Sequence, residues 1–193
     1  MTRKDRWASS RGFTLLELVV VLAIIMIGVL IGYPALQKML VRAKAESALR
    51  QAGMEFRAAR LDAIKQSATV YVQADFANER LAVFRETSDD GFTPATDTFV
   101  REMKLPKGFW FWGPSDPAAE GPSATDNLGT TNREFTFLSS GAAKDIGGVR
   151  FSDSNNFFEV HVEPKATARV TLRKWDGTAW KQQDEGGQRW AWN

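Results

Sequence analysis

Glu17 has the clearest chemical consequence of any residue in this sequence, because its carboxylate stands at the start of a long apolar run. No charged residue occurs from residue 18 to residue 36. A carboxylate in such a segment costs on the order of 2.5 to 3.5 kcal/mol at the middle of a membrane and marks a functional position. Glu17 therefore needs a partner, and a newly exposed α-amino group on an adjacent chain would be a better counter-ion than a headgroup or a proton.

This sequence contains few residues that could carry out catalysis or bind a metal. It has no cysteine, which excludes disulfides, thiolate nucleophiles and cysteine-ligated zinc. The single histidine, His161, lies on the polar side of an alternating run beside Glu159 and Glu163, which indicates a surface residue. The acidic segment at 89–91 with Asp97, and the segment at 153–156, lack EF-hand spacing and indicate plain turns, with a calcium site as the alternative. We expect no enzyme activity, no cofactor and no metal.

Residues 13–36 form the element that must position Glu17. Nineteen uncharged residues at about 1.5 Å each approach the roughly 30 Å hydrocarbon core of a bilayer, so a helix here can span it. A secretory signal peptide is the alternative, but no small-x-small cleavage signal closes the run. The basic excess of the chain lies in residues 1–12, which we expect to stay cytoplasmic. The remainder is nearly neutral, which weakens the case for general nucleic-acid binding.

The segment of residues 11–18, RGFTLLEL, resembles the processing signature of type IV prepilins and type II secretion pseudopilins. The resemblance implies that a prepilin peptidase recognises Arg11, cuts after Gly12 and methylates the new N-terminus at Phe13. It also implies that Glu17 pairs with the terminal amine of a neighbouring subunit during assembly. The implied partners are this peptidase, other pilin or pseudopilin subunits, and the inner-membrane assembly platform.

Three further residues of the apolar run bear on subunit assembly. Gly28 and Gly32 have the G-x-x-x-G spacing that lets helix backbones approach closely in lipid, although glycine is also simply tolerated in membrane helices. Pro34 lacks an amide proton and should kink the helix or loosen the preceding turn. The resemblance implies a helix that partly melts near Pro34 inside the filament.

Beyond the apolar run, the pattern is first helical and then alternating. Residues 37–66 continue the helix with one apolar stripe, and the opposite face with Arg50, Arg57, Arg60 and Lys65 is expected to be solvated. The period then changes from helical to alternating, and Asp176-Gly177 predicts a hairpin before a last strand that ends near residue 183. Residues 114–132 are expected to form a long loop. The other expected strands are 68–73, 80–86, 102–112, 134–138, 149–152, 157–163 and 168–175.

The predicted fold class is α+β: a long N-terminal helix packed on a mainly antiparallel β-sheet domain, which resembles the pilin fold. The expected divisions are a cytoplasmic leader (1–12), a transmembrane and assembly helix (13–36), its amphipathic continuation (37–66) and a periplasmic β domain (67–193). Residues 59–64 and 135–141 and the alternating C-terminal pair most resemble the branch of H-type pseudopilins and FimT-like minor pilins.

The resemblance implies a minor pilin or pseudopilin, anchored by a single span in the bacterial inner membrane, that joins a type II secretion pseudopilus or a type IV pilus near its tip. The alternative is a FimT-like minor pilin that binds DNA during uptake. Lys181, Arg189 and Trp190 would carry this binding, because bases stack on aromatic rings and phosphates attract cations. Where FimT-like tails have G-R-x-R, residues 187–190 here read GQRW, which lacks the first arginine and replaces the second with tryptophan.

Overall fold

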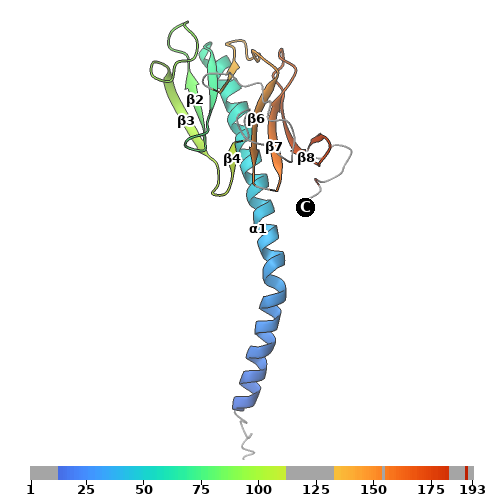
Figure 1. Cartoon of the computed structure of the whole chain (residues 1–193). Helices are drawn as coiled ribbons and strands as arrows, with labels where there is room; N and C mark the ends of the chain where they lie inside the picture. Colours follow the sequence, from blue (N-terminus) through green and yellow to red (C-terminus); the bar gives the residue numbers. More distant parts are fainter. Residues whose placement is uncertain (1–12, 112–132, 154, 183–189, 191–193) are drawn as a thin grey trace, which may run out of the picture. The chain divides into compact units, whose positions relative to one another are not determined.

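The computed structural model describes residues 13–111, 133–153, 155–182 and 190, and the chain divides into two compact units between Arg42 and Ala43. Figure 1 shows one long helix and the strands that follow it. The element bounds are α1 (Leu15–Gln66), β1 (Val70–Asp75), β2 (Arg80–Arg85), β3 (Thr98–Lys104), β4 (Trp110–Phe111), β5 (Glu134–Phe137), β6 (Gly147–Ser152), β7 (Phe157–Val162), β8 (Val170–Trp175) and β9 (Trp180–Gln182). The predicted α+β class is confirmed.

The first unit contains the N-terminal part of α1. Thr14 caps this helix, since its hydroxyl accepts a hydrogen bond from the backbone N–H of Glu17 and its carbonyl accepts one from Leu18, both at 3.2 Å. The helix is continuous through Pro34. Because proline cannot donate to the carbonyl four residues earlier, one bond of the helical ladder is missing there. The kink expected at Pro34 stays a prediction.

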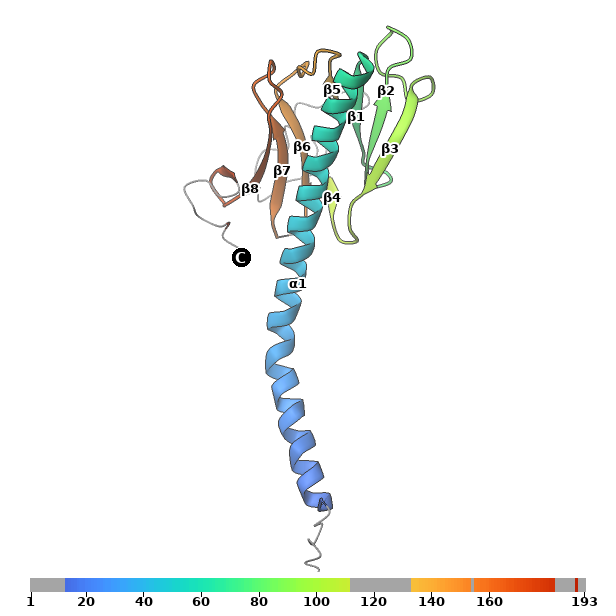
Figure 2. The ribbon, with the colours of Figure 1, turned by 180° about the vertical axis from the view of Figure 1, so that it is seen from behind.

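The second unit folds around the C-terminal part of α1. In Figure 2 this part of the helix lies between the strands β1–β3 and the strands β6–β8. Its buried residues recur at helical spacing and form one stripe, as the sequence predicts: Ala45, Ala48, Leu49, Ala52, Gly53, Phe56, Ala59 and Ala63. The Phe56 ring lies 5.5 Å from Phe135 and 6.1 Å from Phe137 between ring centroids, so the helix is fixed against β5 by aromatic contacts.

Two antiparallel sheets share this core. Sheet A has the strand order β3-β2-β1-β5, and sheet B has the order β4-β6-β7-β8-β9. The main hydrophobic cluster takes residues from α1 and from both sheets. A smaller cluster of Tyr71, Ala82 and Phe84, with Phe92 against it, is separate from the main one. Sheet A therefore buries one face against the helix and carries aromatic residues on the other.

The strand expected over residues 102–112 is wrong as a single element. The structure has β3 and β4 in its place, and they belong to different sheets. Pro106 and Gly108, which has a φ of +90°, bend the chain between them, and the N–H of Phe109 donates to the Pro106 carbonyl. Phe109 and Phe111 are buried in the main core. Trp112 and the loop expected over residues 114–132 lie outside the described residues.

The helix face that was expected to be solvated is only partly so. Arg57 donates to the carbonyl of Val170 at 3.3 Å, and Arg60 donates to the carbonyl of Gly141 at 2.9 Å. Both arginines therefore bind backbone acceptors of the β domain across long sequence separations. Gly141 adopts a φ of +80°, and a side chain there would collide with Ile64.

Candidate functional site

The first candidate site is the start of α1. Phe13 and Glu17 are the described residues of the predicted processing site, whereas Arg11 and Gly12 lie outside the described part of the chain. Phe13 is 79 % exposed and precedes the Thr14 cap directly. Thr14 and Glu17 have the spacing of a capping box, in which a threonine and a glutamate three residues later satisfy the first helical amides. The site is thus a capped helix start with one carboxylate in its first turn.

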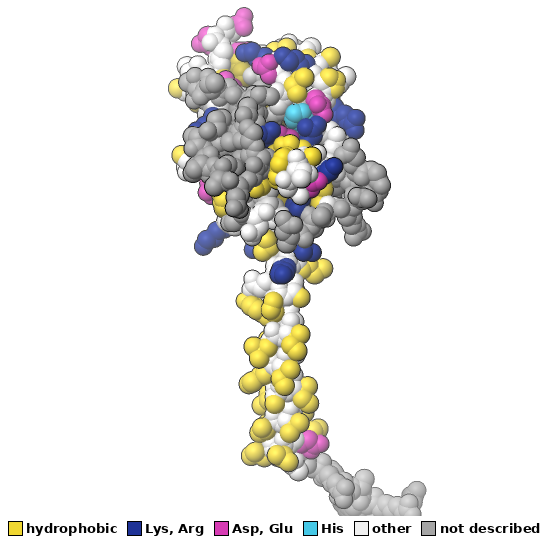
Figure 3. Space-filling model, turned by 45° about the vertical axis from the view of Figure 1, so that its right-hand side comes forward, with side chains coloured by type: hydrophobic (Ala, Val, Ile, Leu, Met, Phe, Trp, Pro, Cys, Tyr) yellow, Lys and Arg dark blue, Asp and Glu magenta, His cyan; other side chains and the backbone are white. Residues whose placement is uncertain are grey.

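An apolar surface follows this capped start. The large hydrophobic side chains of α1 from Leu15 to Val41 are exposed, and α1 is the one helix of the described residues that is long and apolar enough to cross a membrane. Figure 3 shows hydrophobic side chains covering this stretch of helix. Aliphatic surface of this extent has a large cost in water and almost none in lipid or against other apolar helices.

Gly28 and Gly32 lie in this apolar surface. Beyond its own turns of helix, a Cβ atom added at either position would meet no atom of the described residues within 4 Å. Packing among the described residues therefore requires neither glycine. The predicted role of both glycines, close approach of a second helix, stays a prediction that agrees with this open space.

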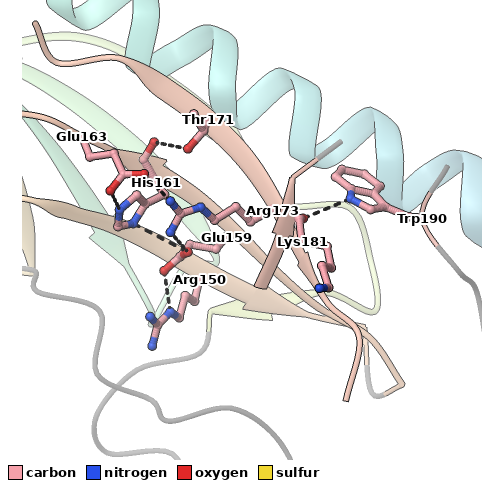
Figure 4. Close-up of polar contacts among 8 residues, drawn as sticks. All are labelled: Arg150, Glu159, His161, Glu163, Thr171, Arg173, Lys181 and Trp190. Atoms are coloured by element: carbon pink, nitrogen blue, oxygen red, sulfur yellow. Dashed lines mark hydrogen bonds and ion pairs between the residues drawn. The ribbon is translucent and has the colours of Figure 1, made fainter. Parts of the chain in front are cut away.

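A second cluster, of charged side chains, lies on sheet B, and Figure 4 shows it together with the contact between Lys181 and Trp190. Glu159 on β7 is 2 % exposed. Its Oε1 accepts a hydrogen bond from Arg150 Nε on β6 at 2.8 Å, and its Oε2 lies 3.6 Å from Arg173 on β8. The register pairs Glu159 directly with both arginines, so the three side chains lie on one face of the sheet and within reach of one another. The carboxylate therefore ties three adjacent strands together.

His161 belongs to the same cluster, and the expectation of a solvated surface histidine is wrong. Its side chain is only 12 % exposed, with Nδ1 at 3.6 Å from Glu159 Oε2 and Nε2 at 3.3 Å from Glu163 Oε2. Glu163 also accepts a hydrogen bond from Arg173. The alternation of the sequence placed these side chains on one face correctly, but that face is largely closed to water.

The electrostatics of the cluster explain why a buried carboxylate is tolerated. Burial alone would raise the pKa of Glu159, but the contact with His161 and the positive charge of Arg150 outweigh it, so the pKa lies below its ordinary value of 4.5. Arg150 also stacks over the ring of Trp180, with 5.1 Å from its guanidinium carbon to the ring centroid. The charges are neutralised inside the cluster, which indicates a structural role.

Of the three predicted DNA-binding residues, the structure describes Lys181 and Trp190. Arg189 lies outside the described residues. Trp190 packs against the main core, and its indole N–H donates to the carbonyl of Lys181 at 3.1 Å. The hairpin expected at Asp176-Gly177 is present, with Trp175 paired to Trp180 and their rings 5.5 Å apart. Trp190 is therefore used to attach the tail to the domain, while the side chain of Lys181 is exposed.

Among the described residues, no group of three or more histidine, cysteine, aspartate or glutamate side chains is placed to hold a metal ion. The acidic segments of the sequence instead serve as turns. Asp153 accepts hydrogen bonds from the backbone amides of Asn155 and Asn156, and the buried Asp97 accepts them from Thr87 and Thr93.

Comparison with known proteins identifies the start of the chain. Residues 7–33 match the model of the prokaryotic N-terminal methylation motif. No curated protein sequence matches the chain. The solved structures to which it is similar include the minor pseudopilin EpsH from the type 2 secretion system of Vibrio cholerae, with 16% identity over 66% of this chain and 95% of that chain at a TM-score of 0.42. A second EpsH structure gives 17% identity over 67% of this chain and 94% of that chain at a TM-score of 0.43.

The type IV minor pilin FimU from Pseudomonas aeruginosa is also similar, with 12% identity over 74% of this chain and 96% of that chain at a TM-score of 0.46. The chain thus carries the N-terminal methylation motif of prepilin-type proteins at its apolar helix, and the predicted resemblance is confirmed. The motif implies processing by a prepilin peptidase and assembly with other pilin-type subunits.

Proposed function

We propose that this chain is a minor pilin or pseudopilin, a structural subunit that is cut after Gly12, methylated at Phe13 and assembled into a type II secretion pseudopilus or a type IV pilus, near its tip. The observation that carries the proposal is the methylation motif at residues 7–33 on a capped helix whose apolar side chains are exposed. Before assembly, the subunit waits in the inner membrane with its C-terminal domain in the periplasm.

The physical logic of assembly follows from the environment of Glu17. A carboxylate in an apolar helix is unfavourable in lipid until a cation reaches it. Cleavage after Gly12 creates an α-amino group at Phe13, which is the missing cation when it comes from a neighbouring subunit. A charge-assisted contact of this kind is strong in a low-dielectric filament core. Helix contacts then replace lipid contacts along the apolar surface, and Gly28 and Gly32 allow close approach.

Mass spectrometry of the chain purified from membranes tests the proposal. The expected N-terminus is Phe13, carrying one added methyl group, in cells with an active prepilin peptidase. Cells that lack the peptidase provide the first control and should yield the chain with residues 1–12 attached. A Gly12→Val variant provides the second, because a branched side chain at the cleaved bond should block the cut. Recovery of residues 1–12 on the wild-type chain in peptidase-active cells would contradict the proposal.

A second experiment tests assembly separately from processing. Sheared filaments and membranes are separated from the same cells, and the chain is quantified in both. The proposal expects the processed chain in the filament fraction in substoichiometric amount, as a minor subunit. Processed chain that stays wholly in the membrane while other subunits form filaments would contradict the filament role but leave the processing step standing.

A further inference from the structure

Two cations follow the apolar part of α1 directly. Lys38 and Arg42 are the first charged residues after Glu17. Because they are four residues apart in a helix, they lie on the same side of α1, one turn from each other. Lys38 is exposed and Arg42 is half-exposed. We call these two residues the basic turn. Neither of them belongs to the processing site or to the charged cluster on sheet B.

The surroundings of Lys38 on α1 contain no anion. The residues three and four positions before it are Ala35 and Pro34, and those three and four positions after it are Val41 and Arg42. Within the described part of the chain, its ammonium group makes no hydrogen bond or ion pair. Like charges four residues apart destabilise a helix. An anion bound between the two side chains would remove this repulsion.

The basic turn lies at the depth where α1 leaves the hydrocarbon core of a membrane. Glu17 and Lys38 are 21 residues apart. In an α-helix this separation is about 32 Å, which matches the roughly 30 Å thickness of the hydrocarbon core. When Glu17 is at one boundary of the core, Lys38 is therefore at the other, at the level of the phospholipid headgroups.

The neighbouring side chains fit this level of the membrane. Tyr33 is 59 % exposed, and its hydroxyl accepts a hydrogen bond from the side-chain amide of Gln37. Tyrosine is enriched at membrane–water interfaces, where its ring is in the apolar layer and its hydroxyl meets polar groups. Met39 and Leu40 are also exposed, so the apolar surface continues between the two cations. Long basic side chains in such a place lay their stems on apolar surface and extend their charges to the headgroups.

The sign of this charge is unusual for its side of the membrane. In the proposed orientation residues 1–12 stay cytoplasmic and the basic turn emerges on the periplasmic side, although lysine and arginine are enriched on the cytoplasmic side. Lys44 follows, so residues 37–45 contain three cations and no acidic residue. Such a concentration of positive charge in the headgroup layer needs counter-ions, and anionic lipids supply them there.

We propose that the basic turn binds the phosphate group of an anionic phospholipid in the periplasmic leaflet of the inner membrane. The phosphate oxygens accept charge-assisted hydrogen bonds from Nζ of Lys38 and from the guanidinium group of Arg42. A phospholipid with a zwitterionic headgroup binds more weakly, because it brings its own cation. The bound lipid holds α1 at a fixed depth, with Glu17 at the opposite boundary. The inference goes beyond the proposed function and rests on it for the single membrane span.

Native mass spectrometry of the full chain in non-ionic detergent tests this inference. The chain is incubated with equal amounts of phosphatidylglycerol and phosphatidylcholine that have the same acyl chains, and the ratio of the two bound lipids is measured. The wild type should prefer phosphatidylglycerol. Lys38→Gln with Arg42→Gln should lower the ratio about fivefold for each cation removed, because a cation near an anionic surface contributes about 1 kcal/mol. Residues 1–12 are the same in both proteins, so their contribution cancels.

Two further variants serve as controls. Lys144→Gln with Arg169→Gln also removes one lysine and one arginine, both exposed in the β domain, and should keep the wild-type ratio. Lys38→Arg with Arg42→Lys exchanges the two cations and keeps both charges. This exchange should retain most of the preference, which separates the loss of charge from a disturbance of the helix.

Three results would overturn the inference. The first is a wild type that binds both lipids equally, or a preference that survives Lys38→Gln with Arg42→Gln. The second is an equal loss of preference in the β-domain control. The third is displacement of phosphatidylglycerol by millimolar inorganic phosphate, because the basic turn would then bind a soluble anion rather than a lipid. None of them bears on the proposed function, which is tested by the N-terminus of the processed chain.

Discussion

The hydroxyl of Thr14 accepts a hydrogen bond from the backbone N–H of Glu17 at 3.2 Å. This contact fixes the first helical turn of α1 directly after Phe13. In the proposed mature subunit the α-amino group of Phe13 would lie next to the cap, and the carboxylate of Glu17 would project from the same capped turn. The cap therefore determines how both charged groups are presented to neighbouring subunits.

Removing the cap should loosen this turn. Thr14→Ala deletes the acceptor of the Glu17 amide, and loss of an N-cap costs about 0.5 to 2 kcal/mol of helix stability. Amide hydrogen exchange of residues 15–18 in the detergent-solubilised chain should accelerate, whereas exchange of the buried helical residues 45–63 should not change. Thr14→Ser keeps the hydroxyl and provides the control. Unchanged exchange in Thr14→Ala would mean that the cap contributes nothing in solution.

Replacing Glu17 should separate processing from assembly. Glu17→Gln keeps the size of the side chain but removes the charge that the neighbouring amine would meet, so we expect cleavage after Gly12 to continue. Incorporation into filaments should fall by about tenfold or more, because a hydrogen bond to a charged group contributes about 1.5 to 3 kcal/mol. The matched control is Glu46→Gln, which alters an exposed helical ion pair with Arg50. Normal incorporation of Glu17→Gln would refute the pairing mechanism.

A glycine on β6 should prove indispensable. A Cβ atom at Gly148 would lie 1.8 Å from the backbone carbonyl oxygen of Val160, which cannot move without breaking the pairing of β6 with β7. Gly148→Ala should therefore destabilise the domain by about 3 kcal/mol, as overpacking of a rigid site does. Urea unfolding of the full chain in detergent measures this loss. Gly91→Ala is the control: a Cβ there would meet nothing within 4 Å, but the φ of +83° is unfavourable for alanine, so this variant should cost about 1 to 2 kcal/mol.

The secondary-structure elements that could be predicted from this sequence are those formed by contacts between residues close together in the chain. The hairpin at Asp176 is one example, because its carboxylate accepts hydrogen bonds from the amides of Thr178 and Ala179, two and three residues away. These bonds lower the pKa of Asp176 to about 2. The capped start of α1, its buried stripe and the alternation of β7 and β8 are local in the same sense.

Features that depend on pairing between distant strands could not be predicted in the same way. Alternation places Glu159 and His161 on a polar face, but the burial of that face depends on Arg150 and Arg173, which reach it only through the register of three strands. The assignment of β3 and β4 to different sheets likewise follows from which strands they meet. Pro106 was the local signal that this run is interrupted.

The buried carboxylate of Glu159 should make stability depend on pH in the acid range. Its pKa is lowered in the folded protein, so its contribution is present above the ordinary value of 4.5 and is lost as the pH falls through the folded value. The free energy of unfolding of the wild type should therefore drop below about pH 5. Glu159→Gln should be about 1 to 3 kcal/mol less stable at neutral pH, because Arg150 loses its charged acceptor, and less sensitive to acid.

The control for this prediction is an exposed ion pair. Asp145 lies 2.8 Å from Lys165, and both side chains are more than half exposed. Asp145→Asn should change stability by less than about 1 kcal/mol and should leave the acid dependence as it is in the wild type. If the free energy of unfolding depended on acid pH identically in the wild type and in Glu159→Gln, other carboxylates would be responsible for that dependence.

Binding of DNA by the tail is the remaining alternative, and the structure sharpens its test. Because Trp190 packs against the core and binds the Lys181 carbonyl, deletion of residues 182–193 would disturb the domain as well as remove the tail. Lys181→Gln with Arg189→Gln removes only the charges. If the tail binds single-stranded DNA, this variant should bind more weakly in a shift assay, and the slope of its salt dependence should fall by about 0.7 for each phosphate that the tail no longer neutralises. The wild type and the variant should bind alike, with the same salt slope, if the basic tail takes no part in binding.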